Sequence, residues 1–342
     1  MHSNHNHYSC GMYGGSFNPL HQGHVRCMIE AANRCDRLVI VISHGVNRGE
    51  IDIRQRYRWV YEATKHFPNV RIMVMEDTAG DKASYSEDMW YADAEKVKAF
   101  AGEPIEAVFF GSDYAPDSMW TKCYPEAEHI ILSRDGISST AIRKAPLRHW
   151  DDMPAFVRPY YVKRVLLMGT ESTGKSTLTV SLARHYNTVW LEEVGRDISM
   201  RSGTDLWMLP GDFTDILLQH KVRQTETAER ANRVFFEDTN CLTTLFYIGF
   251  LDGPDKERNA ALAEAISALN RYDLILLLGP DVPFVQDGDR SETIAADREK
   301  YTRLMAELCL DHGLKAVRID GDYQERYSEA VRLVDRLLEE EQ

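Results

Sequence analysis

Two glycine-rich segments constrain the fold of this chain more than any other feature of its sequence. The first, GGSFNPLHQGH, spans residues 14–24, and the second, GTESTGKST, spans residues 169–177. Each follows a short apolar run and precedes residues whose apolar side chains recur at helical spacing. A glycine turn between a strand and a helix presents backbone N–H groups that, with the helix dipole, favour phosphate. The sequence therefore predicts two phosphate-binding units of α/β type.

Apolar runs of strand length continue through both halves and alternate with helix-length segments. After a weaker lead-in at 9–13, the first half has runs at 38–43, 70–75, 107–111 and 129–133, and the second half has runs at 165–169, 188–192, 234–238, 274–279 and 316–320. Such runs are typical of parallel strands covered on both faces. We therefore expect an α/β protein with two tandem parallel-sheet domains, at residues 1–150 and 151–342.

Residues 144–164 form the expected connection between the two domains. This segment contains three prolines and has no clean periodicity, which is typical of a linker. Its aromatic residues, which include Trp150 and Tyr160, indicate that it packs onto a domain.

The composition excludes several classes of partner. The formal net charge of −13 provides no general attraction to nucleic acid or to an anionic membrane. No apolar run approaches the roughly 18 residues of a membrane span. The six cysteines are scattered without a CxxC pair, which fits a reducing cytoplasm. The sequence leaves open whether the chain forms a homo-oligomer.

His21 and His24 stand where the first glycine turn opens into a helix. Their ring nitrogens can donate hydrogen bonds to a phosphate under attack and so stabilise charge in the transition state. Two helix-capping histidines without chemistry are the alternative, and a zinc site is less favoured because no further ligands lie nearby at metal-like spacing. The residues expected to bind ATP in this turn are Gly14, Gly15, Ser16, Phe17, His21 and His24.

A second motif, ISSTAIR, spans residues 137–143, directly after the last apolar run of the first half. GSFNPLHQGH and ISSTAIR together resemble the GxFxPxHxGH and ISSTxIR motifs of the nucleotidyltransferase superfamily, which transfers AMP or CMP and releases pyrophosphate. The resemblance implies a Rossmann-like domain in which Ser138, Ser139 and Thr140 offer hydroxyls to the triphosphate. Arg143 would add a fixed positive charge. ISST alone would fit an ordinary helix cap.

VLLMGTESTGKSTL has the strand, GxxxxGKS loop and helix start of a P-loop. Backbone N–H groups from Glu171 to Lys175 would cradle the phosphates, Lys175 would reach the β- and γ-phosphates, and Ser176 would hold magnesium. The expected ATP-binding residues here are Gly169, Glu171, Ser172, Thr173, Gly174, Lys175, Ser176 and Thr177.

Acidic residues after two strands of the second half suggest a kinase reaction. Asp238 ends the run VFFED, where P-loop proteins place an acid for magnesium or for a substrate hydroxyl. Glu193 and Arg196 follow the run at 188–192 and are further candidates for catalysis and substrate binding. A surface or capping role is the alternative for each acid.

Several other side chains are candidates for binding phosphate or substrate, each with a simpler alternative. Arg58, with Arg54 and Arg56, could bind phosphate or form a solvated helix face. Asp113 could contact nucleotide or cap a helix. Arg290, in DGDR at 287–290, could clamp phosphate from a lid or stand in a plain turn. Aromatic stacking on the substrate is the hypothesis, and core packing the alternative, for Trp90, Trp207 and Phe250.

Over nearly its whole length the chain resembles the bifunctional NadR-type enzymes of NAD salvage. The resemblance rests on the junction FVRPYYVKRVLLMGTESTGKS and on EEVGRD, EDTN and DGDR downstream. It implies a C-terminal kinase that converts nicotinamide riboside and ATP to nicotinamide mononucleotide. It also implies an N-terminal transferase that adenylylates the mononucleotide to NAD, with Mg²⁺ at the ATP sites.

Two residue-level departures and two alternatives accompany this resemblance. Asn240 in EDTN stands where a second acid is expected, and the stretch from His129 to Ile137 is short. Some family members carry an N-terminal helix-turn-helix repressor domain, which we do not expect here because thirteen residues precede the glycine turn. The alternatives are a different small-molecule acceptor and a nucleotide sensor with one degraded site.

Overall fold

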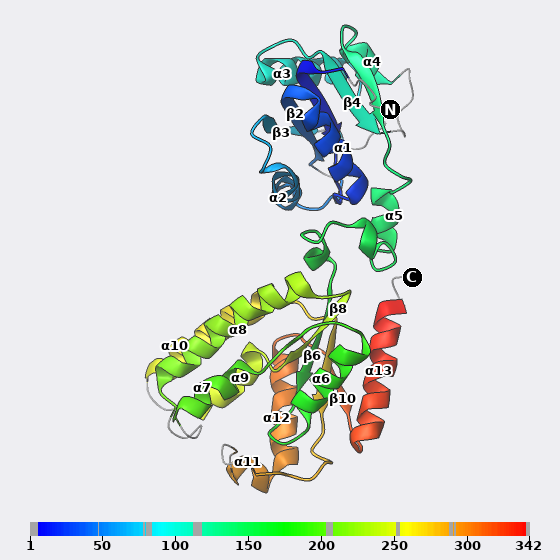
Figure 1. Ribbon diagram of the computed structural model, residues 1–342. Coiled ribbons are helices and arrows are strands. Elements are labelled where there is room, and N and C mark those ends of the chain that lie inside the picture. The colour runs from blue at the N-terminus through cyan, green and yellow to red at the C-terminus, as the bar shows by residue number, and fades with distance from the viewer. Residues whose placement is uncertain are drawn as a thin grey trace. The chain divides into compact units, whose positions relative to one another are not determined.

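The computed structural model describes residues 6–46, 48–77, 79, 84–111, 118–202, 208–250, 254–286, 290 and 292–339. The chain divides into two compact units, Met1–Arg158 and Pro159–Gln342, and each has its own parallel sheet (Figure 1). The α/β class with two tandem parallel sheets is therefore confirmed. The functional boundary expected after residue 150 stays a prediction.

The first unit is a five-stranded parallel sheet in the order β3-β2-β1-β4-β5. Its strands are β1 (Tyr8–Gly15), β2 (Cys35–Gly45), β3 (Val70–Asp77), β4 (Ala107–Gly111) and β5 (Glu128–Leu132). Its helices are α1 (Gln22–Asn33), α2 (Ile53–Thr64), α3 (Glu87–Ala101), α4 (Met119–Cys123), α5 (Ser139–Lys144) and the 3-10 turn η1 (Trp150–Asp152). The strand order reverses between β1 and β4, and sheets of this kind bind ligands beyond the carboxyl ends of their strands at that point.

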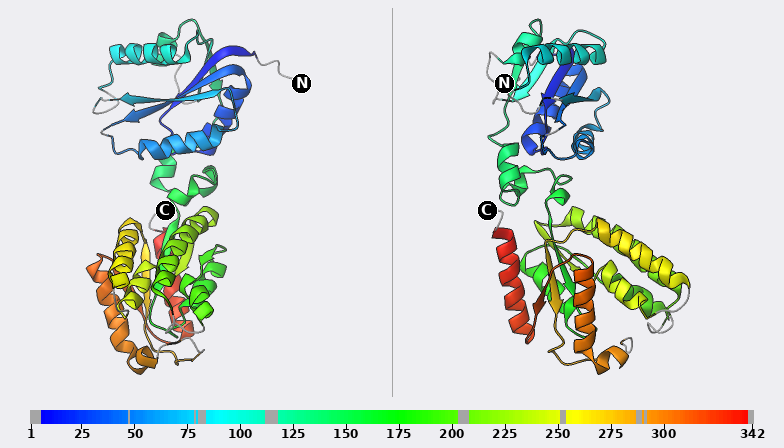
Figure 2. Two further views of the ribbon diagram at one scale, coloured as in Figure 1. Left: turned by 90° about the vertical axis from the view of Figure 1, so that its left-hand side faces the viewer. Right: turned by 180° about the vertical axis from the view of Figure 1, so that it is seen from behind.

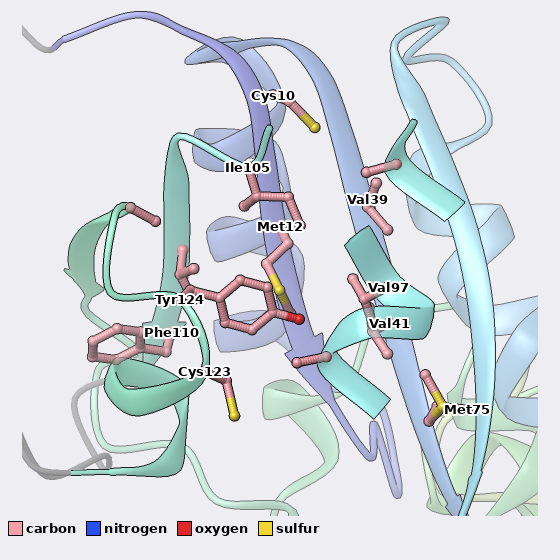
Figure 3. Close-up of a cluster of buried hydrophobic side chains, with 14 residues drawn as sticks. Cys10, Met12, Val39, Val41, Met75, Val97, Ile105, Phe110, Cys123 and Tyr124 are labelled. Carbon is pink, nitrogen blue, oxygen red and sulfur yellow. The ribbon is translucent and has the colours of Figure 1, made fainter. Parts of the chain in front are cut away.

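Helices cover both faces of this sheet. On one face Met12 of β1, Val39 and Val41 of β2 and Phe110 of β4 belong to a buried cluster with Val97 of α3 (Figure 3). Helices α1 and α2 lie on the opposite side of the sheet from α3 (Figure 2, left). Since successive strand residues point to opposite faces, the continuous apolar runs supply both layers of core.

The second unit has a five-stranded parallel sheet in the order β10-β9-β6-β8-β7. Its strands are β6 (Lys163–Met168), β7 (Trp190–Leu191), β8 (Val234–Asp238), β9 (Leu274–Leu278) and β10 (Ala316–Ile319). Its helices are η2 (Arg158–Tyr160), α6 (Lys175–His185), α7 (Val194–Ser202), α8 (Pro210–Arg230), α9 (Cys241–Ile248), α10 (Pro254–Leu269), α11 (Glu292–Ala296), α12 (Arg298–Asp311) and α13 (Tyr323–Glu339). The central strand β6 leads directly into the second glycine turn.

Alternation along β6 divides the core of this unit into two layers. Val165 and Leu167 belong to a cluster with α6 and α13, whereas Leu166 and Met168 belong to a cluster with α9 and α12. Residues 165–168 of β6 are therefore packed on both faces, which holds the loop that follows the strand.

The apolar run at 188–192 forms a much shorter strand than predicted. Only Trp190 and Leu191 pair, and they pair with β8 alone because β7 is the edge of the sheet. In the connecting segment, Trp150 is buried and Tyr160 is exposed, so only part of the predicted packing of its aromatic residues is found. Among the described helices, none is long and apolar enough to cross a membrane.

Candidate active sites

The first glycine turn lies at the carboxyl end of β1 and needs its small residues. A Cβ atom on Gly14 would stand 2.7 Å from the Trp120 indole, and one on Gly15 would stand 2.9 Å from the Phe17 ring. Phe17 is fully buried and packs edge-to-face on His24, with ring centroids 5.1 Å apart. The two glycines are therefore needed because Trp120 and Phe17 pack closely against the turn, and Phe17 in turn supports His24.

His21 and His24 form a reciprocal cap at the start of α1. The backbone N–H of His24 donates to Nδ1 of His21 at 3.3 Å, and the backbone N–H of His21 donates to Nδ1 of His24 at 3.4 Å. The rings stack with centroids 3.6 Å apart, and both residues are buried. Because each Nδ1 accepts, the hydrogen of each neutral ring stands on Nε2. The capping role of the two histidines is therefore compatible with hydrogen-bond donation to a phosphate, because capping fixes the tautomer that has its N–H donor at Nε2.

Burial lowers the pKa of His24 well below its ordinary value, and the neighbouring His21 and Arg134 lower it further. His24 is therefore a neutral hydrogen-bond donor at physiological pH. Arg134 follows β5 and donates to the Tyr13 hydroxyl at 3.3 Å. Apart from its position after a strand, nothing in the sequence distinguishes Arg134.

The ISSTAIR motif docks on the glycine turn. Ser139 donates its hydroxyl hydrogen to the Pro19 carbonyl at 3.0 Å, and the Arg143 guanidinium donates to the Asn18 carbonyl and to the Thr140 hydroxyl. Ser138 is the N-cap residue of α5 but makes no side-chain capping bond, so the simple cap interpretation fails for it. The fold thus brings together the two motifs that the sequence places about 115 residues apart.

A cavity of about 310 Å³, the first cavity, opens beside this turn. Trp90 lines it and meets Trp120 edge-to-face, with centroids 5.1 Å apart. Trp90 is half-buried, so it packs in the core and also faces the cavity. Lining residues that sequence reasoning missed include Arg48, Asp77, Asp93 and Trp120. Asp77 ends β3, so the argument that identified Asp238 at a strand end could have found it.

The three arginines of α2 do not share one environment. Arg56 is fully buried, which contradicts both a phosphate-binding role and a solvated face for this residue. Its guanidinium donates to the carbonyls of Ser16 at 2.7 Å, Ser43 at 3.0 Å and Ile51 at 2.8 Å. Arg54 and Arg58 are exposed, so Arg58 stays a candidate, and Asp113 lies outside the described residues.

The second glycine turn has the backbone conformation of a phosphate loop. Gly169, Ser172 and Gly174 have φ values of 153°, 59° and 85° between the end of β6 and the start of α6. The Thr173 hydroxyl donates to the Thr170 carbonyl at 2.9 Å, and the Lys175 ammonium donates to the same carbonyl at 3.0 Å. The loop therefore curls around its own lysine, and the exposed Thr177 lies beyond it on α6.

Two arginines from late in the chain hold this loop from outside. Arg326 of α13 is buried and donates to the carbonyls of Thr173 at 2.6 Å and Gly279 at 2.9 Å. Arg298 of α12 donates to the Ser172 carbonyl at 3.0 Å. These bonds use carbonyl groups of the loop. In a phosphate loop the N–H groups bind the ligand, so the two arginines do not compete with it.

Asp238 ends β8 beside the loop, as predicted from the sequence. It is 2% exposed, and its Oδ1 makes no hydrogen bond to any described residue. The pKa of Asp238 is raised to about 6: burial is the largest cause and Glu193 adds to the rise, while Lys175 and a hydrogen bond from Ser176 oppose it. A buried, partly satisfied carboxylate next to a P-loop lysine suits a base or a metal ligand.

A second cavity, of about 400 Å³, opens at the loop. It is lined by seven residues identified from the sequence: Glu171, Ser172, Lys175, Glu193, Arg196, Phe250 and Arg290. Arg290 donates to the Val285 carbonyl, and Phe250 is 53% exposed, so Phe250 is not a core residue. Trp207 and the lid residues 287–289 lie outside the described residues.

Helix α8 supplies a wall of the second cavity that sequence reasoning missed. Phe213, Ile216 and His220 lie on one face of this helix and line the cavity. Their spacing of three and four residues is the ordinary signal of a core-facing helix, so nothing in the sequence separated a cavity wall from a core.

Asn240, noted as a departure from the expected acid, has a structural role. Its Oδ1 accepts from the backbone N–H groups of Leu242 at 3.0 Å and Thr243 at 3.2 Å and so caps α9. Its Nδ2 donates to the Tyr272 hydroxyl at 3.3 Å. An aspartate could cap the helix but could not make the second bond as a donor.

Within the described residues no group of three or more His, Cys, Asp or Glu side chains could hold a metal ion. Ser176 and Asp238 nevertheless offer two oxygen donors side by side, one of them the unpartnered Oδ1. Mg²⁺ takes oxygen ligands and usually keeps several waters while it binds phosphate, so this small donor set fits it.

Comparison with known proteins also separates the chain into two segments. Residues 12–145 match the family model described as cytidylyltransferase-like, and residues 164–326 match the one described as an AAA domain. The trifunctional NAD biosynthesis/regulator protein NadR of Salmonella typhimurium is 28% identical over 350 residues, which cover 97% of this chain and 84% of the relative. A crystal structure of NadR with NAD and AMP-PNP is 22% identical, with a TM-score of 0.82 over 98% of each chain, and one of NadR with NR is 21% identical, with a TM-score of 0.81 over 97% of each chain.

The fold and the two sites define a protein that joins a nucleotidyltransferase domain to a P-loop domain of kinase type. The nucleotidyltransferase motifs lie in the first unit and the P-loop lies in the second, along a chain of which 97% aligns with NadR. Over 97% of its length the chain is similar to NadR, in sequence and in fold.

Proposed function

We propose that the protein carries out two successive reactions of NAD salvage. The second unit phosphorylates nicotinamide riboside with ATP to give nicotinamide mononucleotide and ADP. The first unit transfers the adenylyl group of a second ATP to the mononucleotide and gives NAD and pyrophosphate. The observation that carries this proposal is the match to NadR over 97% of the chain, with both motif sets intact.

The first cavity and the histidine pair support adenylyl transfer. A phosphate oxygen of the mononucleotide attacks the α-phosphorus of ATP, and the bond from that phosphorus to the bridging oxygen of pyrophosphate breaks. The Nε2–H groups of His21 and His24 donate to oxygens that gain charge in the transition state. Thr140 and Arg143 bind the triphosphate from the docked α5, and Trp90 packs against the nicotinamide ring.

The second cavity supports phosphoryl transfer to a hydroxyl. Asp238 takes the proton of the riboside 5′-hydroxyl, the freed oxygen attacks the γ-phosphorus, and ADP leaves. Lys175 neutralises the β- and γ-phosphates. Glu193, Arg196 and Arg290 position the substrates at the cavity walls. Ser176 and Asp238 would hold Mg²⁺, which neutralises phosphate charge when it is bound.

The six cysteines are all free thiols. We therefore place the protein in the cytoplasm, where a reducing environment keeps thiols unpaired.

The test supplies each reaction separately to the purified protein with magnesium and identifies products by chromatography. Nicotinamide riboside with ATP should give the mononucleotide and ADP, and the mononucleotide with ATP should give NAD and pyrophosphate. Turnover of pantetheine phosphate instead of the mononucleotide would contradict the assigned acceptor. Nucleotide binding without turnover in either reaction would favour a sensor.

A further inference from the structure

A buried histidine that the proposed mechanism does not use lines the second cavity. His220 of α8 is 3% exposed, and its Nε2 lies 2.8 Å from Oε1 of Glu237. Glu237 is fully buried and directly precedes Asp238 on β8. The hydrogen-bond partner of His220 is therefore the residue next to Asp238, the carboxylate beside the phosphate loop.

The partners of Glu237 determine which nitrogen of His220 carries hydrogen. Gln224 Nε2 donates to both carboxylate oxygens at 3.0 and 3.1 Å, and the Tyr272 hydroxyl donates to Oε1 at 2.9 Å. The Lys221 ammonium, a donor only, lies 3.0 Å from Gln224 Oε1 and so fixes the orientation of that amide. A buried carboxylate surrounded by donors accepts from each of them. Nε2 of His220 therefore carries the hydrogen.

The other ring nitrogen, Nδ1, is then the one available to a molecule in the cavity. Within the part of the chain that the structure describes, the hydrogen bond of His220 is made through Nε2 alone. With the hydrogen on Nε2, the lone pair of Nδ1 can accept a hydrogen bond, so it suits a hydroxyl group.

The position of His220 along α8 indicates which part of an acceptor it meets. Ile216 and Phe213 lie one and two turns before it and give the same wall an apolar section. That section suits an aromatic ring. A sugar attached to such a ring would lie toward His220 on the same wall, and Lys175 of the phosphate loop lines the same cavity.

We propose that His220 determines specificity in the kinase reaction: Glu237 holds its ring, and its Nδ1 accepts a hydrogen bond from a secondary sugar hydroxyl of the nucleoside acceptor. This inference rests on the proposed phosphorylation of a riboside at the second cavity. His220 does not take part in proton transfer.

Two substitutions separate contact with the substrate from support of the fold. The amide end of glutamine reaches the position of Nε2, so His220→Gln keeps a donor to Glu237 and removes the acceptor in the cavity. Asparagine places its amide near Nδ1, so His220→Asn keeps a polar group in the cavity and breaks the bond to Glu237. The KM values for nicotinamide riboside and for ATP are measured for both variants and the unchanged protein.

We expect His220→Gln to raise the KM for the riboside about tenfold, the effect of one lost hydrogen bond, with the KM for ATP unchanged. His220→Asn should keep the riboside KM closer to that of the unchanged protein. A normal riboside KM in His220→Gln together with a raised one in His220→Asn would show a purely supporting role and overturn the proposal.

A measurement on the unchanged protein does not depend on how the variants fold. The 2′-deoxy and 3′-deoxy analogues of nicotinamide riboside are compared with the riboside itself. The proposal requires that removal of one of these hydroxyls raises the KM about tenfold, and equal KM values for all three would overturn it. If the unchanged protein fails to phosphorylate the riboside, the proposed function fails first, which is a distinct result.

Discussion

At the scale of single residues, the two sites depend on side chains held in unfavourable or tightly fixed states. Asp238 is buried, with one oxygen that has no hydrogen-bond partner among the described residues, and the rings of His21 and His24 are fixed by each other's backbone. Such arrangements cost folding free energy and persist where function requires them. Each can therefore be tested by a substitution that separates stability from activity.

Asp238→Asn should abolish kinase activity and stabilise the fold at neutral pH. The pKa of Asp238 is about 6 in the folded protein, above the ordinary aspartate value. Its contribution to stability is therefore complete below the ordinary pKa and is lost as the pH rises through about 6. At about pH 7.5 the buried, ionised carboxylate destabilises the folded state. Its replacement by the neutral amide should therefore raise the free energy of unfolding by up to about 3 kcal/mol.

Chemical denaturation of both proteins at several pH values tests this expectation. The difference in unfolding free energy should shrink towards zero near pH 4, where the native carboxyl is protonated as well. In the unchanged protein, kcat/KM for the riboside should rise with pH through about 6 and then level off. Lower stability of the variant at every pH would contradict the strained-carboxylate account.

His24→Ala should reduce adenylyl transfer and leave phosphorylation of the riboside intact. The variant removes one Nε2–H donor to the transition state, which typically costs about 10²–10³ in kcat. The pKa of His24 is depressed, so its loss should not shift the acid side of the transferase pH profile. Kinase turnover by the same sample is the internal control, and a similar loss of both activities would contradict separate sites.

At the scale of helices and strands, Arg56 shows that a buried charge fastens the first glycine turn to its neighbours. It links the turn, β2 and the start of α2 through three carbonyls and lies 3.1 Å from Glu50. Removal of one partner of a buried ion pair typically costs 3–5 kcal/mol.

Arg56→Ala should therefore lower the free energy of unfolding by about 3–5 kcal/mol. The exposed Arg54 on the same helix provides the matched control, and its replacement by alanine should change stability by no more than about 0.5 kcal/mol. Urea titration of both variants measures the difference. Equal effects would show that Arg56 has no special structural role.

Some of these features could be predicted from the sequence, and others depend on the fold. Strand ends at Gly15 and Asp238 were predictable because apolar runs stop there and the motifs have fixed spacing. The burial of Arg56 was not, because it depends on carbonyls of Ser16 and Ser43 that are distant along the chain. Likewise His220 has the spacing of a core helix, and only the fold reveals that this face borders a cavity.

At the scale of the whole molecule, the proposed function combines two reactions in which the product of one is the substrate of the other. The match to NadR extends along 97% of the chain, and each unit has its own sheet, glycine turn and cavity. The mononucleotide made at the second cavity is the acceptor proposed for the first. If each site works independently, a variant impaired at one site should be complemented by a second molecule in which that site is intact.

The most direct test mixes two variants, each impaired in a different one of the two reactions. Lys175→Ala removes the P-loop ammonium and should abolish phosphorylation, while His24→Ala weakens adenylyl transfer. Nicotinamide riboside, ATP and magnesium are added to each variant and to an equal mixture, and NAD is measured by chromatography over the time in which the unchanged protein completes the conversion. We expect NAD from the mixture and little from either variant alone. Rapid NAD formation by one variant alone, or none by the mixture, would contradict two separate sites acting in sequence.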